Sequence, residues 1–391
     1  MCGGQTTQWG QAPLCGPVCG AAIERKVLNR MTHTIRKVAL VGCGIMGSAI
    51  GGHVLDAGYD LTVHTRTRSK AEGLLARGAH WAATPAQAAA GADAVLTMVG
   101  YPSDVEDVYL GTNGILEAAP KGAWLVDLTT SSPELARELH DAAEVMDKHA
   151  FDCPVTGGDT GARAGTLTLI AGTTEAEAAP VRALLDSFSA KIVWFGRPGT
   201  GQAAKLCNQV SLAACMMGYA EALSLAEQEG VDPQLLLDVM NNGTGGSGAS
   251  RTLAPRSLAG DYKPGFQVEH LRKDLGLALA AADDAGINLP ACEDAHLLFD
   301  AICRMGGSHM GTQALTLIYS DGETCRAAGL DPDALEDLAD MEAPGGTERP
   351  AGGATGTDAG ASAAGADASD DPDADWLSDL WASVDASEGG E

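Results

Sequence analysis

One segment near the N-terminus, residues 36–64, restricts the possible folds of this chain more than any other. The apolar run Lys37–Val41 is rich in β-branched residues and is followed at once by Gly42-Cys43-Gly44-Ile45-Met46-Gly47. Residues 48–57 then predict a helix, and residues 60–64 predict a second strand. A strand, a glycine-rich turn, a helix and a strand within about 30 residues are typical of a unit that binds a dinucleotide.

Each glycine of this turn has a separate physical task in such a unit. Gly42 permits the tight turn, Gly44 lets the backbone approach a pyrophosphate, and Gly47 lets the helix pack closely on the strand. The unpaired N–H groups at the helix N-terminus then face the phosphates. We therefore predict that the whole turn binds cofactor, through Gly42, Cys43, Gly44, Ile45, Met46 and Gly47. A purely structural glycine turn is the alternative interpretation.

The residues after the second predicted strand indicate which dinucleotide binds. An NAD site places Asp or Glu about 20 residues after the first glycine, where the carboxylate binds the ribose hydroxyls. This chain instead has Thr65-Arg66-Thr67-Arg68, and no carboxylate occurs before Glu72. A guanidinium binds a 2′-phosphate through a planar fork of donors, and the threonines add hydroxyl donors. The pattern predicts NADP; the alternative is a solvated basic helix start, with NAD also accepted.

Further strands alternate with helices up to about residue 196. Apolar runs predict strands at 94–99, 124–127, 150–155, 167–171 and 191–195. Such alternation predicts the α/β class, with a largely parallel, doubly wound sheet of the Rossmann type. Ligands bind at the carboxyl ends of the strands in these sheets.

Two polar motifs follow strands of this predicted sheet. Thr130 comes after the strand at 124–127, and Thr156-Gly157-Gly158 comes after the strand at 150–155. Hydroxyls and a glycine turn with exposed N–H groups suit a small carboxylate. Taken alone, each motif is also typical of an ordinary helix cap or turn.

A long helix follows from Gly199 to about Glu229, because this stretch is rich in alanine, leucine and methionine and contains no proline. It would be on the order of 40 Å long, enough to join two domains. Lys205, Asn208 and Gln209 have i, i+3 and i+4 spacing, so they share one face near its start. A solvated surface lysine is the alternative interpretation of Lys205.

After the long helix the pattern is almost entirely helical. Helices are predicted at 233–240, 271–285 and 290–305, with a glycine-rich mobile loop at 241–250. Lys273-Asp274 in the second of these helices would by itself be a surface ion pair. We therefore expect four regions: a disordered extension at 1–34, a Rossmann domain at 35–196, an all-helical domain at 197–330 and an acidic tail at 331–391.

Charge and composition exclude several classes of protein. The formal net charge is −27, and no basic stripe is present, so nucleic acid is not an expected partner. No apolar run reaches the roughly 18 residues of a membrane span, and the ten scattered cysteines favour a reduced, cytoplasmic protein. The acidic tail predicts disorder, although Trp376 and Trp381 would share an apolar face if their segment became helical.

Five motifs, in their order and spacing, resemble the β-hydroxyacid dehydrogenase family, which includes 3-hydroxyisobutyrate dehydrogenase and tartronate semialdehyde reductase. The resemblance covers about residues 36–320 and rests on five stretches: residues 42–47, Asp127–Pro133, Asp152–Gly158, Gly199–Gln209, and Lys263–Phe266 with Lys273-Asp274. Several members have Ser in place of Thr156 and Asn in place of Gln209, and residues 98–104 depart from the usual Leu-Pro-Asn loop.

The resemblance implies an NAD(P)-dependent oxidoreductase that moves a hydride between the nicotinamide and a small β-hydroxy acid or semialdehyde. It implies that Lys205 is the general acid and base, and that Asn208 and Gln209 orient the substrate and the lysine. It also implies that Thr130, Thr156, Gly157 and Gly158 hold the substrate carboxylate, and that Val99, Thr130 and Lys273 contact the cofactor. A homodimer or homotetramer is implied as well.

Three other kinds of protein share this fold. A non-catalytic NADPH-binding interaction protein is one alternative, although such relatives lose the lysine that this chain retains at position 205. Imine reductases generally lack this lysine, and 6-phosphogluconate dehydrogenases need a larger helical domain and more basic phosphate ligands.

Overall fold

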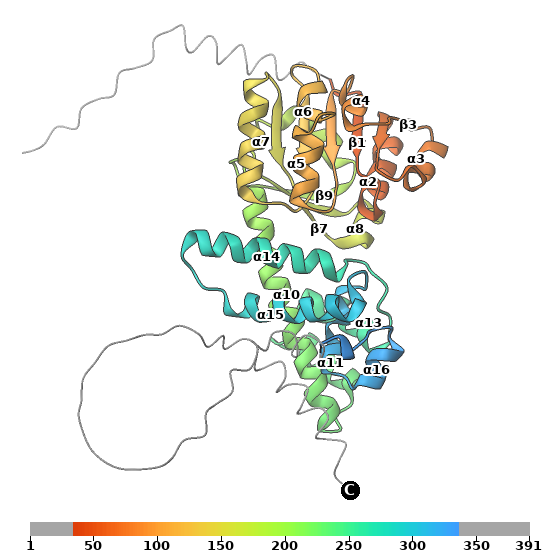
Figure 1. Cartoon of the computed structure of the whole chain (residues 1–391), viewed down its shortest axis with the longest axis vertical. Helices are drawn as coiled ribbons and strands as arrows, with labels where there is room; N and C mark the ends of the chain where they lie inside the picture. The colour runs from red at the N-terminus through yellow and green to blue at the C-terminus, as the bar shows by residue number, and fades with distance from the viewer. Residues whose placement is uncertain (1–33, 336–391) are drawn as a thin grey trace, which may run out of the picture. The chain divides into compact units, whose positions relative to one another are not determined.

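The computed structural model describes residues 34–335. These residues form two compact units, of which the first ends at Lys205 and the second begins at Leu206 (Figure 1). The predictions made above for residues 1–33 and 336–391, including those on Trp376 and Trp381, lie outside the described residues.

The first unit contains a six-stranded, fully parallel sheet, which confirms the predicted fold class. The strand order is β3-β2-β1-β4-β5-β6, the doubly wound order in which the chain starts in the middle and builds outward in both directions. The strands are β1 (Lys37–Val41), β2 (Asp60–His64), β3 (His80–Trp81), β4 (Ala94–Thr97), β5 (Trp124–Asp127) and β6 (His149–Asp152).

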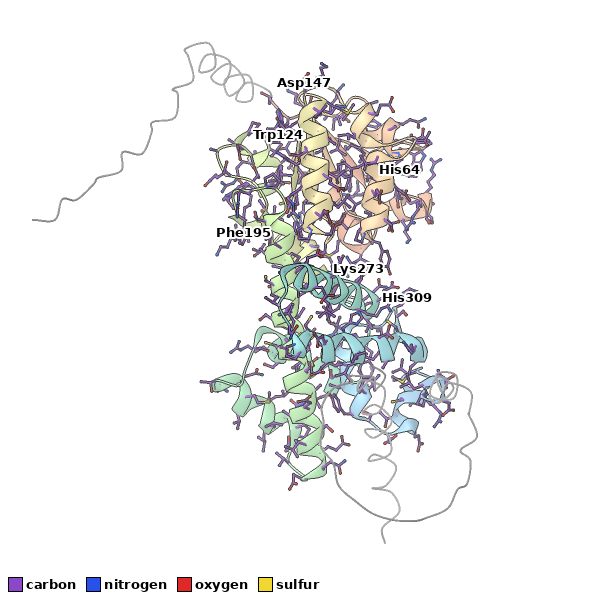
Figure 2. The ribbon with its side chains drawn as sticks, turned by 60° about the vertical axis from the view of Figure 1, so that its left-hand side comes forward. His64, Trp124, Asp147, Phe195, Lys273 and His309 are labelled. Atoms are coloured by element: carbon purple, nitrogen blue, oxygen red, sulfur yellow. The ribbon has the colours of Figure 1, made fainter. Side chains whose placement is uncertain are left out.

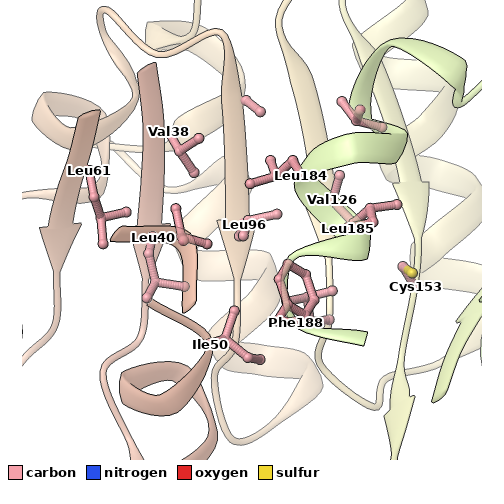
Figure 3. Packing of buried hydrophobic residues seen from close by; sticks show 14 of the residues in the cluster. Val38, Leu40, Ile50, Leu61, Leu96, Val126, Cys153, Leu184, Leu185 and Phe188 are labelled. Atoms are coloured by element: carbon pink, nitrogen blue, oxygen red, sulfur yellow. The ribbon is translucent and has the colours of Figure 1, made fainter. Parts of the chain in front are cut away.

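Alternate side chains of these strands enter two separate cores, because successive residues point to opposite faces. Leu40, Leu96 and Val126 lie in one core with Leu184 and Phe188, as Figure 3 shows. That face is covered by α2 (Ile45–Asp56), η1 (Arg68–Ala71), α3 (Glu72–Ala76), η2 (Ala179–Val181) and α9 (Arg182–Asp186).

The opposite face buries Val41, Val95 and Leu125 under four other helices of the unit. These are α4 (Pro85–Ala89), α5 (Pro102–Leu110), α6 (Ile115–Ala118) and α7 (Pro133–Val145), the last three lying along the sheet in Figure 1. With helices on both faces, the strands are near-continuous apolar runs, as a buried parallel sheet requires.

The strands predicted at 167–171 and 191–195 do not join this sheet, so the expectation of one sheet was wrong. They form a second, three-stranded sheet, in which β7 (Val155–Thr156) pairs antiparallel with β8 (Leu167–Ala171), and β8 pairs parallel with β9 (Ser189–Trp194). The predicted strand 150–155 divides between the sheets at Pro154, which has no N–H group to donate to a neighbouring strand. The short helix α8 (Gly158–Ala164) connects β7 and β8.

The predicted long helix is confirmed as α10 (Thr200–Gln228), 29 residues that include the boundary between the two units. Its apolar stripe enters the core of the second unit through Met216, Tyr219 and Leu223. Completely burying side chains of this size stabilises a core by about 1.5–3 kcal/mol each.

The second unit is entirely helical among its described residues. Its elements are α11 (Pro233–Asn242), α12 (Gly248–Thr252), α13 (Ala254–Leu258), α14 (Val268–Ala285), α15 (Pro290–Ile302), the π-helical turn η3 (Cys303–Gly307), the 3₁₀ helix η4 (Thr312–Tyr319) and α16 (Gly322–Ala327). The region 241–250 is not wholly loop, since Ser247 and Ser250 form a reciprocal cap that starts α12. Helix α15 is shorter than predicted, because the chain passes into η3 at Cys303.

Candidate active site

The glycine turn between β1 and α2 has the geometry that its sequence predicts. Gly42 has a φ of 102°, and a Cβ built there would lie 2.1 Å from the carbonyl oxygen of Met98. A Cβ on Gly47 would lie 1.9 Å from the carbonyl oxygen of Gly42. A Cβ on Gly44 would have no heavy atom within 4 Å. Gly44 is also the N-cap of α2 and, as a glycine, gives the N–H groups of the first turn no side-chain cap. The turn therefore leaves room and N–H donors for a phosphate where Gly44 stands.

Basic side chains lie directly after β2, as predicted for the side of the site that binds the 2′-phosphate. The side chain of Arg66 is 84% exposed, and its guanidinium pairs with Asp104 of α5 at 3.0 Å. Arg68 lies over the ring of Trp81, with 5.4 Å between its guanidinium carbon and the ring centroid. Thr65 is half-buried and Thr67 is exposed in the same loop. Arg66 is thus accessible for a phosphate. Its surface ion pair with Asp104 is worth at most about 1 kcal/mol.

A buried polar network joins the ends of β4 and β5. Asp127 accepts hydrogen bonds from the hydroxyl of Thr97 at 2.7 Å and from the backbone N–H of Thr129 at 3.1 Å. The hydroxyl of Thr129 in turn accepts from the backbone N–H of Val99 at 3.1 Å. Val99 also lies beside the glycine turn, since its side chain would be 3.3 Å from a Cβ on Gly42. The network thus holds the backbone at the predicted cofactor residue Val99 and at Thr129, directly before the predicted substrate residue Thr130.

Burial perturbs the acidic groups of this network. Desolvation raises the pKa of Asp127 to about 6, although the hydrogen bonds from Thr97 and Thr129 act in the opposite direction. Asp152 is the direct neighbour of Asp127 across the paired strands β5 and β6, and burial raises its pKa as well. These two carboxylates therefore take up protons more readily than exposed ones.

Asp152 holds the start of the long helix. Its two carboxylate oxygens accept from the backbone N–H groups of Gly199 at 2.8 Å and Gln202 at 2.7 Å. Two donors that a helix leaves unpaired at its N-terminus are thereby satisfied by a buried acid. A Cβ on Gly201 would lie 2.4 Å from the carbonyl oxygen of Ile170 in β8, so glycine is needed for this close approach. The first turn of α10 is therefore anchored to the sheet.

Gln202 connects that first turn to the loop after β5. Its side-chain N–H₂ group donates to the carbonyl of Thr129 at 2.7 Å, and its side-chain oxygen accepts from the N–H of Ser131 at 2.9 Å. Gln202 is completely buried. One amide thus holds the residues on both sides of Thr130, which is itself half-buried.

Lys205 follows Gln202 by three residues, so the two side chains are neighbours on the helix surface. Only 7% of Lys205 is exposed, which argues against the interpretation of this residue as a solvated surface lysine. Gln209 is buried as well, whereas Asn208 is exposed and donates its side-chain amide to the oxygen of Gln209 at 3.0 Å.

Within the second unit, Gln209 is linked to α14. Its amide donates to Asp274 at 2.7 Å, and Asp274 pairs with the ammonium of Lys273 at 2.9 Å. The side chains of Lys273 and Asp274 are 11% and 2% exposed, so the expectation of a surface ion pair was wrong. Figure 2 labels Lys273 on this helix. The burial depends on tertiary contacts, of which the hydrogen bond from Gln209 of α10 to Asp274 is one.

The glycine turn after β7 has an unusual backbone. Gly157 and Gly158 have φ values of 126° and 62°, a region that side chains other than glycine rarely adopt. Thr156, directly before them, is half-buried and lies in β7 opposite Thr168. The sequence predicted this turn at the end of a strand of the parallel sheet. The structure instead places it at the edge of the second sheet, directly after β7.

Two family models match the chain. One is described as the NAD binding domain of 6-phosphogluconate dehydrogenase and matches residues 37–196. The other is described as the NAD-binding domain of NADP-dependent 3-hydroxyisobutyrate dehydrogenase and matches residues 199–319. The mouse mitochondrial 3-hydroxyisobutyrate dehydrogenase is 33% identical over 289 residues, which cover 72% of this chain and 86% of that protein. The chain belongs to the β-hydroxyacid dehydrogenase family.

Other members of the family match over a similar span. An uncharacterised oxidoreductase of Bacillus subtilis, YkwC, is 40% identical over 284 residues, which cover 73% of this chain and 99% of that protein. The solved 3-hydroxyisobutyrate dehydrogenase of Mycobacterium tuberculosis with L-serine has a TM-score of 0.68 and 31% identity, and it covers 74% of this chain and 100% of its own. The chain is thus an NAD(P)-binding oxidoreductase of this family.

Neither a metal centre nor a membrane span is found within residues 34–335. These residues contain no group of three or more His, Cys, Asp or Glu side chains placed to hold a metal ion. None of the helices in this range combines the length and apolar character that crossing a membrane requires.

The sequence motifs contained two residues whose importance became visible only in three dimensions. Asp152 and Gln202 stand inside motifs quoted for other residues, and neither was predicted as a site residue. Their partners lie 47–73 positions away along the chain. One signal was available: a glutamine and an aspartate in otherwise apolar or glycine-rich surroundings need hydrogen-bond partners when buried.

Proposed function

We propose that this dehydrogenase catalyses the NADP-dependent interconversion of a small β-hydroxy acid and its semialdehyde, of the 3-hydroxyisobutyrate type, with Lys205 as general acid and base. The observation that carries the proposal is the placement of Lys205. It is buried one helical turn after Gln202, whose amide holds both sides of Thr130. An ammonium and a hydroxyl on segments that are fixed to each other suit a substrate with a carbonyl group and a carboxylate.

The cofactor, when bound, supplies or accepts the hydride. In the reducing direction the ammonium of Lys205 donates a proton to the carbonyl oxygen of the substrate, and in the oxidising direction the amine accepts it back. Proton transfer of this kind contributes typically about 10²–10⁴-fold to the rate. The hydroxyl of Thr130 and the turn Thr156-Gly157-Gly158 bind the carboxylate, while Asn208 and Gln209 orient the substrate and the lysine.

The proposed preference for NADP is supported by the loop after β2. Arg66 is exposed there, and residues 65–68 contain no carboxylate for a ribose hydroxyl. The open space at Gly44 fits the pyrophosphate. Lys273 is the proposed cofactor contact from α14, and its charge is balanced by Asp274.

We also propose that the protein forms a homodimer or homotetramer in the cytoplasm. Leu225 near the end of α10 and Leu235 and Val239 on α11 are 64%, 66% and 71% exposed, and Val231 between these helices is 46% exposed. Exposed apolar side chains mark interaction sites when they form one patch, and we propose that these four lie in a surface that a second copy covers. The seven cysteines of the described residues are all free thiols, which suits a reducing compartment.

The experiment is a substrate screen with purified enzyme. NADPH oxidation is followed at neutral pH with methylmalonate, tartronate and succinate semialdehydes and with glyoxylate, and the Lys205→Ala variant serves as the control for contaminating activity. The proposal predicts turnover of at least one aldehyde that the variant lacks. NADPH binding without turnover of any of them would contradict the enzymatic function and favour a non-catalytic NADPH-binding protein.

A further inference from the structure

We infer that Gln202 is a positioning residue for the reaction: its side-chain amide fixes the Thr129–Ser131 loop to the turn of α10 that carries Lys205. The inference rests on the proposed function of Lys205 and Thr130, and it assigns to Gln202 a task that neither of those residues can perform.

The contacts of Gln202 use both ends of its amide. The N–H₂ group donates to the carbonyl of Thr129 at 2.7 Å, and the oxygen accepts from the N–H of Ser131 at 2.9 Å. To pair with both backbone groups, a side chain of this length needs a donor for the carbonyl of Thr129 and an acceptor for the N–H of Ser131. The side chain is completely buried, so water does not replace either bond.

These contacts are separate from those that start the helix. The backbone N–H groups of Gly199 and Gln202 are satisfied by Asp152, and Gly201 packs directly against the carbonyl of Ile170. The first turn of α10 therefore remains anchored without the side-chain amide of Gln202. What the amide adds is a defined position of the loop, and hence of Thr130, relative to that turn.

The position of the Thr129–Ser131 loop matters because the Gln202 amide links the segments of two proposed site residues, Thr130 and Lys205. Thr130 stands between the two residues that Gln202 holds, and Lys205 stands three residues after Gln202 on the same helix. An error of about 1 Å in the placement of reacting groups can cost about 10²-fold in rate. Loss of the amide is therefore expected to lower catalysis far more than it lowers cofactor binding.

The first test is the Gln202→Met variant, which keeps the length of the side chain and removes both hydrogen bonds. Gln228→Met makes the same chemical change at the exposed end of α10 and is the matched control. We expect kcat for the best aldehyde to fall about 10- to 100-fold in Gln202→Met, with NADPH affinity within about 2-fold of wild type. Gln228→Met should leave both quantities unchanged.

The second test uses Gln202→Glu. A protonated carboxyl has one donor and one acceptor, as the amide has, whereas a carboxylate has only acceptors and faces the carbonyl of Thr129. Burial raises the pKa of a carboxyl, so the protonated form persists at mildly acidic pH. The kcat of this variant, divided by that of wild type at the same pH, should therefore fall as pH rises from about 5.5 to about 8.5. The buried carboxyls of Asp127 and Asp152 lie near this turn and titrate in both proteins, so their effect on kcat largely cancels in the ratio. The basic side chains near the turn, Lys205 and Arg137, are likewise common to both proteins.

A third measurement needs no substrate. Hydrogen exchange of the peptide that contains Ser131 should be faster in Gln202→Met than in wild type, because the N–H of Ser131 loses its acceptor. This readout separates the inference from the proposed function: faster exchange supports the contact even if no aldehyde is turned over.

Three results would overturn the inference. One is unchanged exchange at Ser131 together with a kcat within about 2-fold of wild type. Another is a parallel loss of melting temperature, NADPH binding and kcat in Gln202→Met, which would indicate a general structural role. The last is a Gln202→Glu activity ratio that does not change with pH.

Discussion

Replacing Asp127 by Asn should make the stability of this protein less dependent on pH. Asp127 is 6% exposed, and one of its oxygens accepts both hydrogen bonds, from Thr97 and from Thr129. An asparagine oxygen can accept the same two bonds in the same place. The substitution therefore removes the buried charge while it keeps the contacts that position the loop after β5.

The magnitude follows from the pKa. Burial, the largest effect on this carboxyl, raises its pKa from 3.8 to about 6 in the folded protein. Because folding raises this pKa, the contribution of Asp127 to the free energy of unfolding is fully present below pH 3.8. It is lost as pH rises through about 6. The total is about 3 kcal/mol of unfolding free energy, of which about 2 kcal/mol is lost between about pH 4.5 and about pH 8.

Asparagine can bring its own cost, because its N–H₂ group requires an acceptor where the carboxylate required a donor. An unpaired buried donor costs about 1–3 kcal/mol, but this cost is independent of pH. The melting temperature of the variant minus that of wild type is therefore compared at two pH values. The change in this difference reports the effect of the Asp127 charge on stability, because the cost of the asparagine is the same at both.

The assay is thermal unfolding of both proteins at about pH 4.5 and about pH 8. The variant should gain about 4–8 °C relative to wild type on going from the lower to the higher pH, since 1 kcal/mol corresponds to about 2–4 °C for a unit of this size. A difference that stays constant within about 1 °C, or that changes in the opposite direction, would refute the assigned pKa and its cause.

Three further substitutions test the cofactor site. Arg66→Ala should weaken NADPH binding roughly 10- to 150-fold and leave NADH binding nearly unchanged, because a charge-assisted contact to a phosphate is worth about 1.5–3 kcal/mol. Titration of the variant with each cofactor measures this, and equal losses of affinity for both would contradict the NADP preference. Gly44→Ala should keep the wild-type melting temperature, because its Cβ enters open space, but should weaken NADPH binding at least about 10-fold, because that space is where the pyrophosphate would lie. Gly47→Ala should lower the melting temperature as well, because its Cβ meets the carbonyl of Gly42 at 1.9 Å; equal melting temperatures for the two glycine variants would argue against this division of roles.

Local patterns were sufficient for much of the fold. Glycine spacing predicted the turn between β1 and α2, since three adjacent backbone requirements are encoded within six residues. Composition predicted the long helix, which is observed from Thr200 to Gln228. Both features depend on neighbours along the chain, which a sequence displays directly.

Features that depend on distant partners were not accessible in the same way. Strands 167–171 and 191–195 have the composition of parallel-sheet strands, and only Pro154 indicated that the chain leaves the first sheet before them. Lys273 and Asp274 are adjacent in sequence, as in many exposed pairs, and only the three-dimensional structure shows that both side chains are largely buried and that Asp274 accepts from Gln209 of α10. Gln202 and Asp152 acquire their importance through contacts with residues 47–73 positions away, which no local pattern encodes.

In the proposed reaction Lys205 transfers the proton, and the cofactor binds at a site that does not depend on this side chain. The most direct test measures single-turnover reduction of the best aldehyde, together with NADPH affinity, in wild type and in Lys205→Ala. We expect the rate to fall at least about 10²-fold in the variant, while NADPH affinity stays within about 2-fold of wild type. A variant that retains more than about a tenth of the wild-type rate would contradict the assignment of Lys205 as the general acid.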